Sequence, residues 1–166
     1  GDQAVPLGSR HGLVLFLYPS RKQVLVWDPV TAEQHRIALP PRFTGHVNMA
    51  AIHGAVLRAA GAIRHFQVVL LEANDQHTRA TVCVYSSETG MWGGIVSSAE
   101  PCTGAVSRHP CTFTGSALYW RLIGGGDGIL EFDLDNQSLT VIDWPTDDPV
   151  LTNSCTIRGE DGGVGV

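Results

Sequence analysis

The sequence predicts an all-β fold, a partial β-propeller of about three four-stranded blades followed by the start of a fourth. Two observations support this prediction. Short apolar runs bounded by turn residues fill most of the 166-residue chain, and one strand–turn–strand unit recurs three times. Hydrophobic residues make up 43% of the chain and charged residues only 16%. That balance disfavours both long solvated helices and a disordered charged tail.

The expected strands are short, and each ends at residues that favour turns. Gly12–Tyr18 is an apolar run closed by Pro19-Ser20, and Gln23–Trp27 ends at Asp28-Pro29. The glycines of Gly124–Gly128 tolerate a positive φ and predict a hairpin connection. Four later runs have the same length and the same β-branched or aromatic bias: Phe66–Leu71, Thr81–Tyr85, Ala117–Ile123 and Ile129–Phe132.

The repeated unit is a strand that carries an aromatic residue near its end, then a polar turn, then a second strand. Three segments align so that Trp27, Tyr85 and Phe132 coincide, at separations of 58 and 47 residues. Ten positions after each aromatic comes an isoleucine that we place inside the second strand: Ile37, Ile95 and Ile142. Blades of a propeller bury both faces against their neighbours, which explains core aromatics at equivalent places.

We expect one domain over residues 1–166, with blades at about 9–40, 50–98 and 111–145 and an incomplete blade at 152–166. The chain starts with glycine and ends in Gly-Val-Gly-Val, so we expect a fragment of a longer chain or a truncated gene product. Met49–Ile63 is the one stretch that could be helical, although its glycines disfavour that. The competing fold is a β-sandwich, but in that fold the match between the three strand–turn–strand segments would be a coincidence.

Several segments, in order from residue 9 to residue 145, resemble the F-box-associated domains of plants, particularly a large grass subfamily. They include Val-Trp-Asp-Pro-Val-Thr at 26–31, Val-Tyr-Ser-Ser-Glu-Thr-Gly at 84–90 and Ile-Leu-Glu-Phe-Asp-Leu at 129–134. The resemblance implies a kelch-like propeller that captures the protein to be modified by an SCF-type ubiquitin ligase. An N-terminal F-box binds the ligase's Skp-type adaptor in that family. No segment here resembles an F-box, so adaptor binding depends on one upstream.

The resemblance predicts a non-catalytic module that binds a protein substrate, which the sequence does not identify. Candidate contact loops are Pro40–Asn48, Asn74–His77 and Glu100–Pro110, with no single contact residue assigned. The net charge of -5 argues against nucleic acid as the partner. The longest apolar run, Leu13–Tyr18, is far too short to span a membrane. We expect a protein of the cytoplasm or nucleus with reduced cysteines.

No catalytic, cofactor or metal site is predicted. Cys102, His109 and Cys111 lack the ligand spacing of known zinc sites. Gly115-Ser116 lacks the second glycine of a nucleophile elbow, and Gly124–Gly128 lacks the lysine of a phosphate-binding loop. A hydrolytic enzyme is therefore disfavoured. Two hypotheses compete with the protein-binding module. One is a carbohydrate-binding propeller, which needs exposed Trp or Tyr beside Asp or Asn, and the second is a truncated family copy without activity of its own.

The remaining polar and aromatic residues are assigned structural roles. Asp28 and Asp133 are expected to accept hydrogen bonds from turn amides, and the seven histidines to make ordinary surface or strand contacts. Six aromatic residues within strands or at strand ends are expected in blade cores: Trp27, Tyr85, Trp92, Trp120, Phe132 and Trp144.

Overall fold

The fold is all-β, as the sequence predicts. The computed structural model describes residues 3–43, 51–58, 64–73, 79–102, 104–107, 111–123, 128–143, 157–158 and 164–165. Regular structure among these residues consists of strands and two short 3-10 turns. The chain divides into two compact units, residues 1–72 with 82–95 and residues 73–81 with 96–166.

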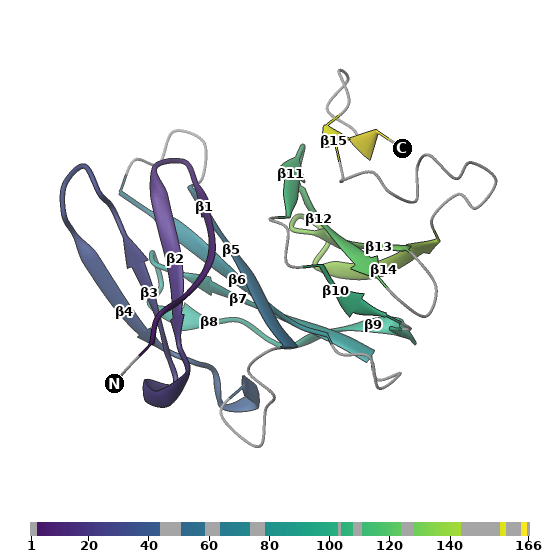
Figure 1. Ribbon diagram of the computed structural model, residues 1–166, viewed down its shortest axis with the longest axis horizontal. Coiled ribbons are helices and arrows are strands. Elements are labelled where there is room, and N and C mark those ends of the chain that lie inside the picture. Colours follow the sequence, from purple (N-terminus) through teal and green to yellow (C-terminus); the bar gives the residue numbers. More distant parts are fainter. Residues whose placement is uncertain are drawn as a thin grey trace. The chain divides into compact units, whose positions relative to one another are not determined.

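The first sheet is a four-stranded antiparallel meander within the first unit (Figure 1). Its strands are β1 (Val5–Arg10), β2 (Leu13–Tyr18), β3 (Gln23–Trp27) and β4 (Gln34–Ala38). The 3-10 turn η1 (Pro19–Arg21) joins β2 to β3 at the predicted Pro-Ser turn, and η2 (Pro41–Phe43) follows β4. In the strand order of this sheet, β4 stands at the outer end.

The second sheet has the order β5, β6, β7 and β8, and β9 also pairs with β7. The bounds are β5 (Ile52–Arg58), β6 (Phe66–Glu72), β7 (Arg79–Ser86), β8 (Met91–Trp92) and β9 (Val96–Pro101). Within Met49–Ile63, the stretch that could have been helical, the described residues Ile52–Arg58 form the strand β5. Its apolar side chains are buried on successive positions, as in a strand covered on both faces.

The prediction that Ile95 lies inside a strand is wrong. The backbone N–H of Gly93 still donates to the Val84 carbonyl oxygen at 2.7 Å, and the chain then leaves the ladder. Ile95 lies between β8 and β9 and is 44% exposed. The glycine pair at 93 and 94 interrupts the strand because it adds no side chains to pack on the sheet.

The third sheet belongs to the second unit. Its order is β10 (Ala105–Val106), β12 (Ala117–Ile123), β13 (Gly128–Asp133) and β14 (Ser138–Asp143), and β11 (Thr112–Thr114) also pairs with β12. A short pair, β15 (Ile157–Arg158) with β16 (Val164–Gly165), follows. Of the predicted Gly124–Gly128 hairpin only Gly128, which begins β13, is among the described residues.

The hairpins β3–β4, β7–β8 and β13–β14 are equivalent. Each aromatic of the repeat pairs with the residue seven positions later: Trp27 with Gln34, Tyr85 with Trp92, and Phe132 with Leu139. Five positions after each aromatic the backbone is left-handed, with φ of 64° at Ala32, 70° at Gly90 and 53° at Gln137. The alignment drawn from the sequence therefore identifies three copies of one backbone hairpin.

Glycine at this hairpin position is expected to stabilise the protein. A side chain in the left-handed region costs about 1–2 kcal/mol, partly offset by the greater freedom of glycine in the unfolded chain. Ala32→Gly should therefore raise the free energy of unfolding by about 0.5–1 kcal/mol in urea titrations. Gln137→Gly should raise it by less, because it also removes the hydrogen bond that Gln137 Nε2 donates to the Leu134 carbonyl oxygen at 2.8 Å. Gly90→Ala is the matched reverse change and should lower it. If Gly90→Ala changed the free energy of unfolding in the same direction as the two changes to glycine, the three hairpins would not be equivalent at this position.

The first and second sheets pack face to face through an apolar core in the first unit. Leu13, Leu15 and Leu17 alternate along β2 with half-buried residues, and all three belong to this core. The second sheet contributes buried residues of β5, β6 and β7: Ile52, Val56, Phe66, Val68, Leu70 and Cys83. A Cβ on Gly54 would lie 3.0 Å from the Val69 carbonyl oxygen and 3.1 Å from Leu15 Cδ2. Glycine therefore permits the close approach of the two sheets at β5.

The aromatic residues of the repeat differ in burial. Phe132 is 0% exposed and Trp120 is 2% exposed, so both are core residues of the second unit as predicted. The other described aromatics of that prediction are half-buried: Trp27, Tyr85 and Trp92. The Trp92 indole Nε1 donates to the Ala38 carbonyl oxygen at 2.9 Å and so joins β8 to β4. Trp144 lies outside the described residues.

Candidate functional site

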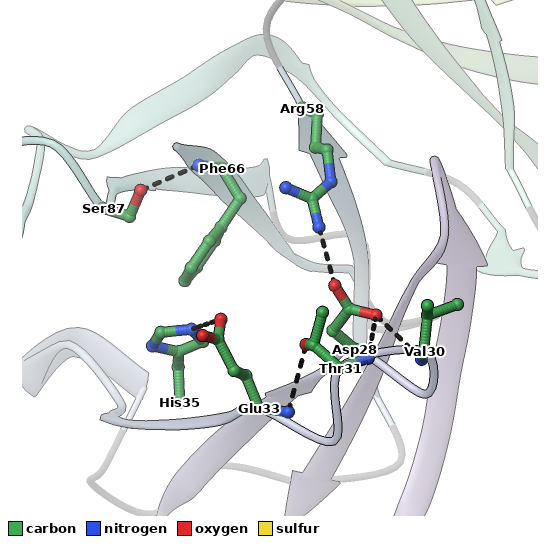
Figure 2. Close-up of polar contacts among 8 residues, drawn as sticks. All are labelled: Asp28, Val30, Thr31, Glu33, His35, Arg58, Phe66 and Ser87. Carbon is green, nitrogen blue, oxygen red and sulfur yellow. Dashed lines mark hydrogen bonds and ion pairs between the residues drawn. The ribbon is translucent and has the colours of Figure 1, made fainter. Parts of the chain in front are cut away.

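A cleft opens in the first unit where turns of the first sheet meet strands of the second. Its volume is about 440 Å³, and we call it the Asp28 cleft. Figure 2 shows the Arg58 side chain directed toward Asp28 and the Phe66 ring near His35. The lining residues come from both sheets: Leu13, Asp28, Thr31, Glu33, His35, Arg58, Arg64 and Phe66.

Arg58, at the end of β5, binds two turns of the first sheet. Its Nη2 donates to Asp28 Oδ2 at 3.2 Å, and its Nε donates to the His11 carbonyl oxygen at 3.3 Å. The backbone N–H of Arg58 also donates to His11 Nδ1 at 3.1 Å. The side chains of the ion pair are only 24% and 15% exposed, so solvent screens their attraction incompletely. Arg58 therefore fixes the β1–β2 and β3–β4 turns against the second sheet.

The Asp28 carboxylate also organises its own turn, as the sequence predicts. Its Oδ1 accepts hydrogen bonds from the backbone N–H groups of Val30 and Thr31, at 3.0 and 3.3 Å. Asp133 Oδ1 accepts the equivalent bonds from Asp135 and Asn136, at 2.9 and 3.1 Å. Both aspartates therefore stabilise the start of a repeated hairpin rather than presenting a bare carboxylate.

These contacts lower the pKa of both aspartates. Desolvation alone would raise the pKa of Asp28, but the hydrogen bonds from Thr31 and Val30 and the charge of Arg58 outweigh it. For Asp133 the backbone hydrogen bond from Asn136 is the largest cause of the lowered pKa, and it outweighs a smaller desolvation effect. A carboxyl group whose pKa is lower in the folded chain stabilises the fold above its unfolded pKa, and this contribution is lost as the pH falls through the folded value.

The double substitution Asp28→Asn with Asp133→Asn should therefore weaken the acid dependence of stability. We expect the wild-type chain to lose its advantage over this variant as the pH is lowered from 7 to below about 3. Urea unfolding curves at a series of pH values measure the difference. Asp135→Asn is the control, since it removes an exposed carboxylate from the same turn as Asp133. A constant difference between wild type and the double variant would contradict the assigned pKa directions.

A second hollow of about 470 Å³ is lined by four successive residues of β4, and we call it the β4 groove. Its lining residues are Gln34, His35, Arg36, Ile37, Arg64, His65, Phe66, Tyr85 and Ser87. It shares His35, Arg64 and Phe66 with the Asp28 cleft, so the two hollows adjoin. The ring centroids of His35 and Phe66 lie 5.1 Å apart. Ser87 fixes the Phe66 backbone, since its Oγ accepts from the Phe66 N–H at 2.8 Å and its N–H donates to the Phe66 carbonyl oxygen at 3.0 Å.

The contact loops predicted from the sequence lie largely outside the described residues. Asn74–His77 is entirely outside them, and Pro40–Asn48 is described only to residue 43. In Glu100–Pro110, position 103 and positions 108–110 are outside, among them His109 of the cysteine–histidine set. The contact role of these loops stays a prediction. Sequence reasoning did not identify Arg58, Arg64 or Phe66 as site residues.

Several reactive groups in the described residues are held in their neutral forms. Burial raises the pKa of the Cys83 and Cys102 thiols, and Cys83 Sγ lies 3.2 Å from the Gly93 carbonyl oxygen. Desolvation, with a smaller contribution from Glu131, raises the pKa of Tyr119 to about 12. Among the described residues, no three His, Cys, Asp or Glu side chains gather in a way that could hold a metal ion. In that part of the chain no helix has the length and hydropathy needed to cross a membrane.

The comparison with known families agrees with the all-β fold and with the repeated hairpins. Residues 2–160 match the family model described as F-box protein At3g26010-like, beta-propeller. No curated protein matches the sequence. The family match covers nearly the whole chain and confirms the resemblance to F-box-associated propellers. The chain belongs to the At3g26010-like family of F-box protein β-propeller domains.

Proposed function

We propose that this chain is the substrate-recognition propeller of an F-box protein and holds a target protein for an SCF-type ubiquitin ligase. The match of residues 2–160 to the propeller of an F-box protein is the observation that carries the proposal. In this role the chain binds and performs no chemistry. The adaptor contact belongs to an F-box, and the compartments that fit such a ligase are the cytoplasm and the nucleus.

The organisation that fits this role is one sheet per blade. We assign blades to about residues 9–40, 50–98 and 111–145, with a further incomplete blade at 152–166. Support comes from the three equivalent hairpins, each at the end of the third strand in its sheet order. The packing of the first two sheets through a shared apolar core is also typical of adjacent propeller blades.

The Asp28 cleft and the β4 groove support a binding role. Several polar groups in and beside the cleft form hydrogen bonds with one another, such as those that Arg58 donates to Asp28 and His11. Such contacts hold the walls in place. Exposed side chains that can meet a partner remain around them, including Glu33, His35 and Arg64. A fixed surface carrying a few exposed charged groups suits protein recognition better than catalysis.

The test is targeted ubiquitination. A longer product with an F-box upstream of this chain is expressed in plant cells beside the chain alone, and both are purified with their bound proteins. We expect target proteins with both, the Skp-type adaptor only with the longer product, and ubiquitin transfer to the targets only in the reconstituted complex. Equal recovery of the adaptor by both products, or no ubiquitin transfer to any bound protein, would contradict the ligase role. Binding confined to a glycan array would favour a carbohydrate-binding propeller instead.

A further inference from the structure

Backbone N–H and carbonyl groups at the outer edge of β4 face away from β3, the strand with which β4 pairs. The Asp28 N–H donates to the Glu33 carbonyl oxygen at 2.9 Å, and the Leu39 N–H donates to the Lys22 carbonyl oxygen at 2.9 Å. The register between β3 and β4 is unbroken between these two bonds. Since hydrogen-bonded and non-hydrogen-bonded pairs alternate along an antiparallel ladder, Val24–Ile37 and Val26–His35 are hydrogen-bonded pairs. The N–H and carbonyl groups of Gln34, Arg36 and Ala38 therefore point to the outer edge.

A side-chain donor already uses this edge at one position. The Trp92 indole donates to the Ala38 carbonyl oxygen at 2.9 Å, which shows that the edge accepts a hydrogen bond from outside the sheet. In the described part of the chain, no strand pairs with β4 at Gln34 and Arg36 on that side. Both residues line the β4 groove.

The charges around this edge are basic. The charged lining residues of the β4 groove are Arg36 and Arg64, with no Asp or Glu among them. Glu33 of the adjoining Asp28 cleft has its Oε2 3.9 Å from His35 Nε2. On the opposite face of the sheet, the Arg36 and Arg21 guanidinium carbons lie 5.6 and 6.0 Å from the centroid of the Tyr18 ring. The chain as a whole has a net charge of -5, so this basic edge departs from its general charge. Charge complementarity therefore selects an acidic partner.

We propose that an extended acidic segment of a partner protein binds as an added strand along the outer edge of β4. Its backbone pairs with the outward groups of Gln34 and Arg36, and its carboxylates face Arg64. Main-chain hydrogen bonds give such a complex its affinity, while the alternating side chains give it selectivity. The inference rests on the proposed function, because it names the kind of target segment that the propeller holds.

The direct test uses a fluorescent synthetic peptide of about seven residues that alternates glutamate with valine, with anisotropy as the readout. We expect saturable binding that weakens as salt is added. The same peptide with N-methyl groups on all its backbone amide nitrogens should lose binding, since neither of its edges can donate to the β4 edge. A lysine–valine peptide should bind at least tenfold more weakly. Equal binding of the N-methylated or the lysine peptide overturns the proposal, as does tighter binding of a single-stranded RNA of similar length.

Substitutions in the intact chain separate the backbone contribution from the charge. Arg36→Pro removes an N–H that points to the edge and leaves the β3–β4 ladder intact, and proline is tolerated at sheet edges. It should weaken peptide binding more than Arg36→Ala does, with thermal melts to confirm that both variants fold. Arg64→Glu should weaken binding at least tenfold, whereas Arg79→Glu, an exposed arginine outside the groove, should not. Peptide affinity unchanged in both Arg36→Pro and Arg64→Glu overturns the proposal.

The experiments distinguish failure of the proposed function from failure of this inference. If Arg64→Glu abolishes peptide binding but target ubiquitination continues, the ligase role survives and the acidic strand is not how targets are held, which overturns the inference. If the peptide binds as expected but no protein is ubiquitinated, the edge site stands and the ligase role is lost.

Discussion

Phe132→Ala is expected to destabilise the second unit strongly. Phe132 is fully buried in the middle of the third sheet, between Leu118 of β12 and Leu139 of β14. Removing a buried phenylalanine ring leaves a cavity that the surrounding sheet fills only in part. The expected cost is about 3–5 kcal/mol in the free energy of unfolding, measured by urea titration.

Two matched variants isolate the cause of this effect. Phe113→Ala deletes the same ring from a half-buried position on β11, so its cost should be clearly smaller. Phe132→Leu keeps most of the volume and should cost less than about 1.5 kcal/mol. If Phe132→Ala and Phe113→Ala cost the same, burial at Phe132 is not what stabilises the third sheet.

Gly54→Val should destabilise the first unit strongly, through overpacking rather than a cavity. Its Cβ would meet the Val69 carbonyl oxygen at 3.0 Å, and a backbone atom in the middle of β6 has little room to move. Leu15 Cδ2 and Leu7 Cδ1, at 3.1 and 3.2 Å, would also have to shift. A cost of about 3 kcal/mol, the upper end for overpacked cores, is expected in the same assay.

Gly94→Val is the control for the glycine-to-valine change itself. A Cβ at Gly94 would have open space around it, and its backbone is not left-handed. This variant should be as stable as the wild-type chain, apart from the small entropic effect of replacing a glycine. A second comparison, Leu15→Ala combined with Gly54→Val, should be less destabilised than the sum of the single changes, because the shortened side chain makes room. Strict additivity would mean that Leu15 and residue 54 do not compete for space.

The strands could be predicted where an apolar run ended at a turn. β3 matches the predicted Gln23–Trp27, and β2 begins one residue inside the predicted run. The hydrogen bonds of Asp28 and Asp133 also follow from local chemistry, because an aspartate bonds the amides two and three positions later. The prediction that Ile95 lies inside a strand was wrong for a local reason too, since the two glycines before it end the strand.

The candidate site could not be predicted from the spacing of its residues in the sequence. Asp28 and Arg58 are 30 positions apart and His11 and Arg58 are 47 apart, with no motif that relates them. They meet because the first two sheets pack face to face and place the end of β5 beside two turns of the first sheet. Arg64 and Phe66 line the same space because the start of β6 lies there too. Only the arrangement of the sheets brings these residues together.

The basic edge of β4 also affects how copies of this protein behave toward one another. Open sheet edges are templates for aggregation, and charged side chains are a common protection against it. Two copies aligned edge to edge at β4 would bring Arg36 of each chain against the other, a repulsion that discourages dimers and fibrils. The same charges that would attract an acidic strand would therefore oppose edge-to-edge pairing of two copies at β4.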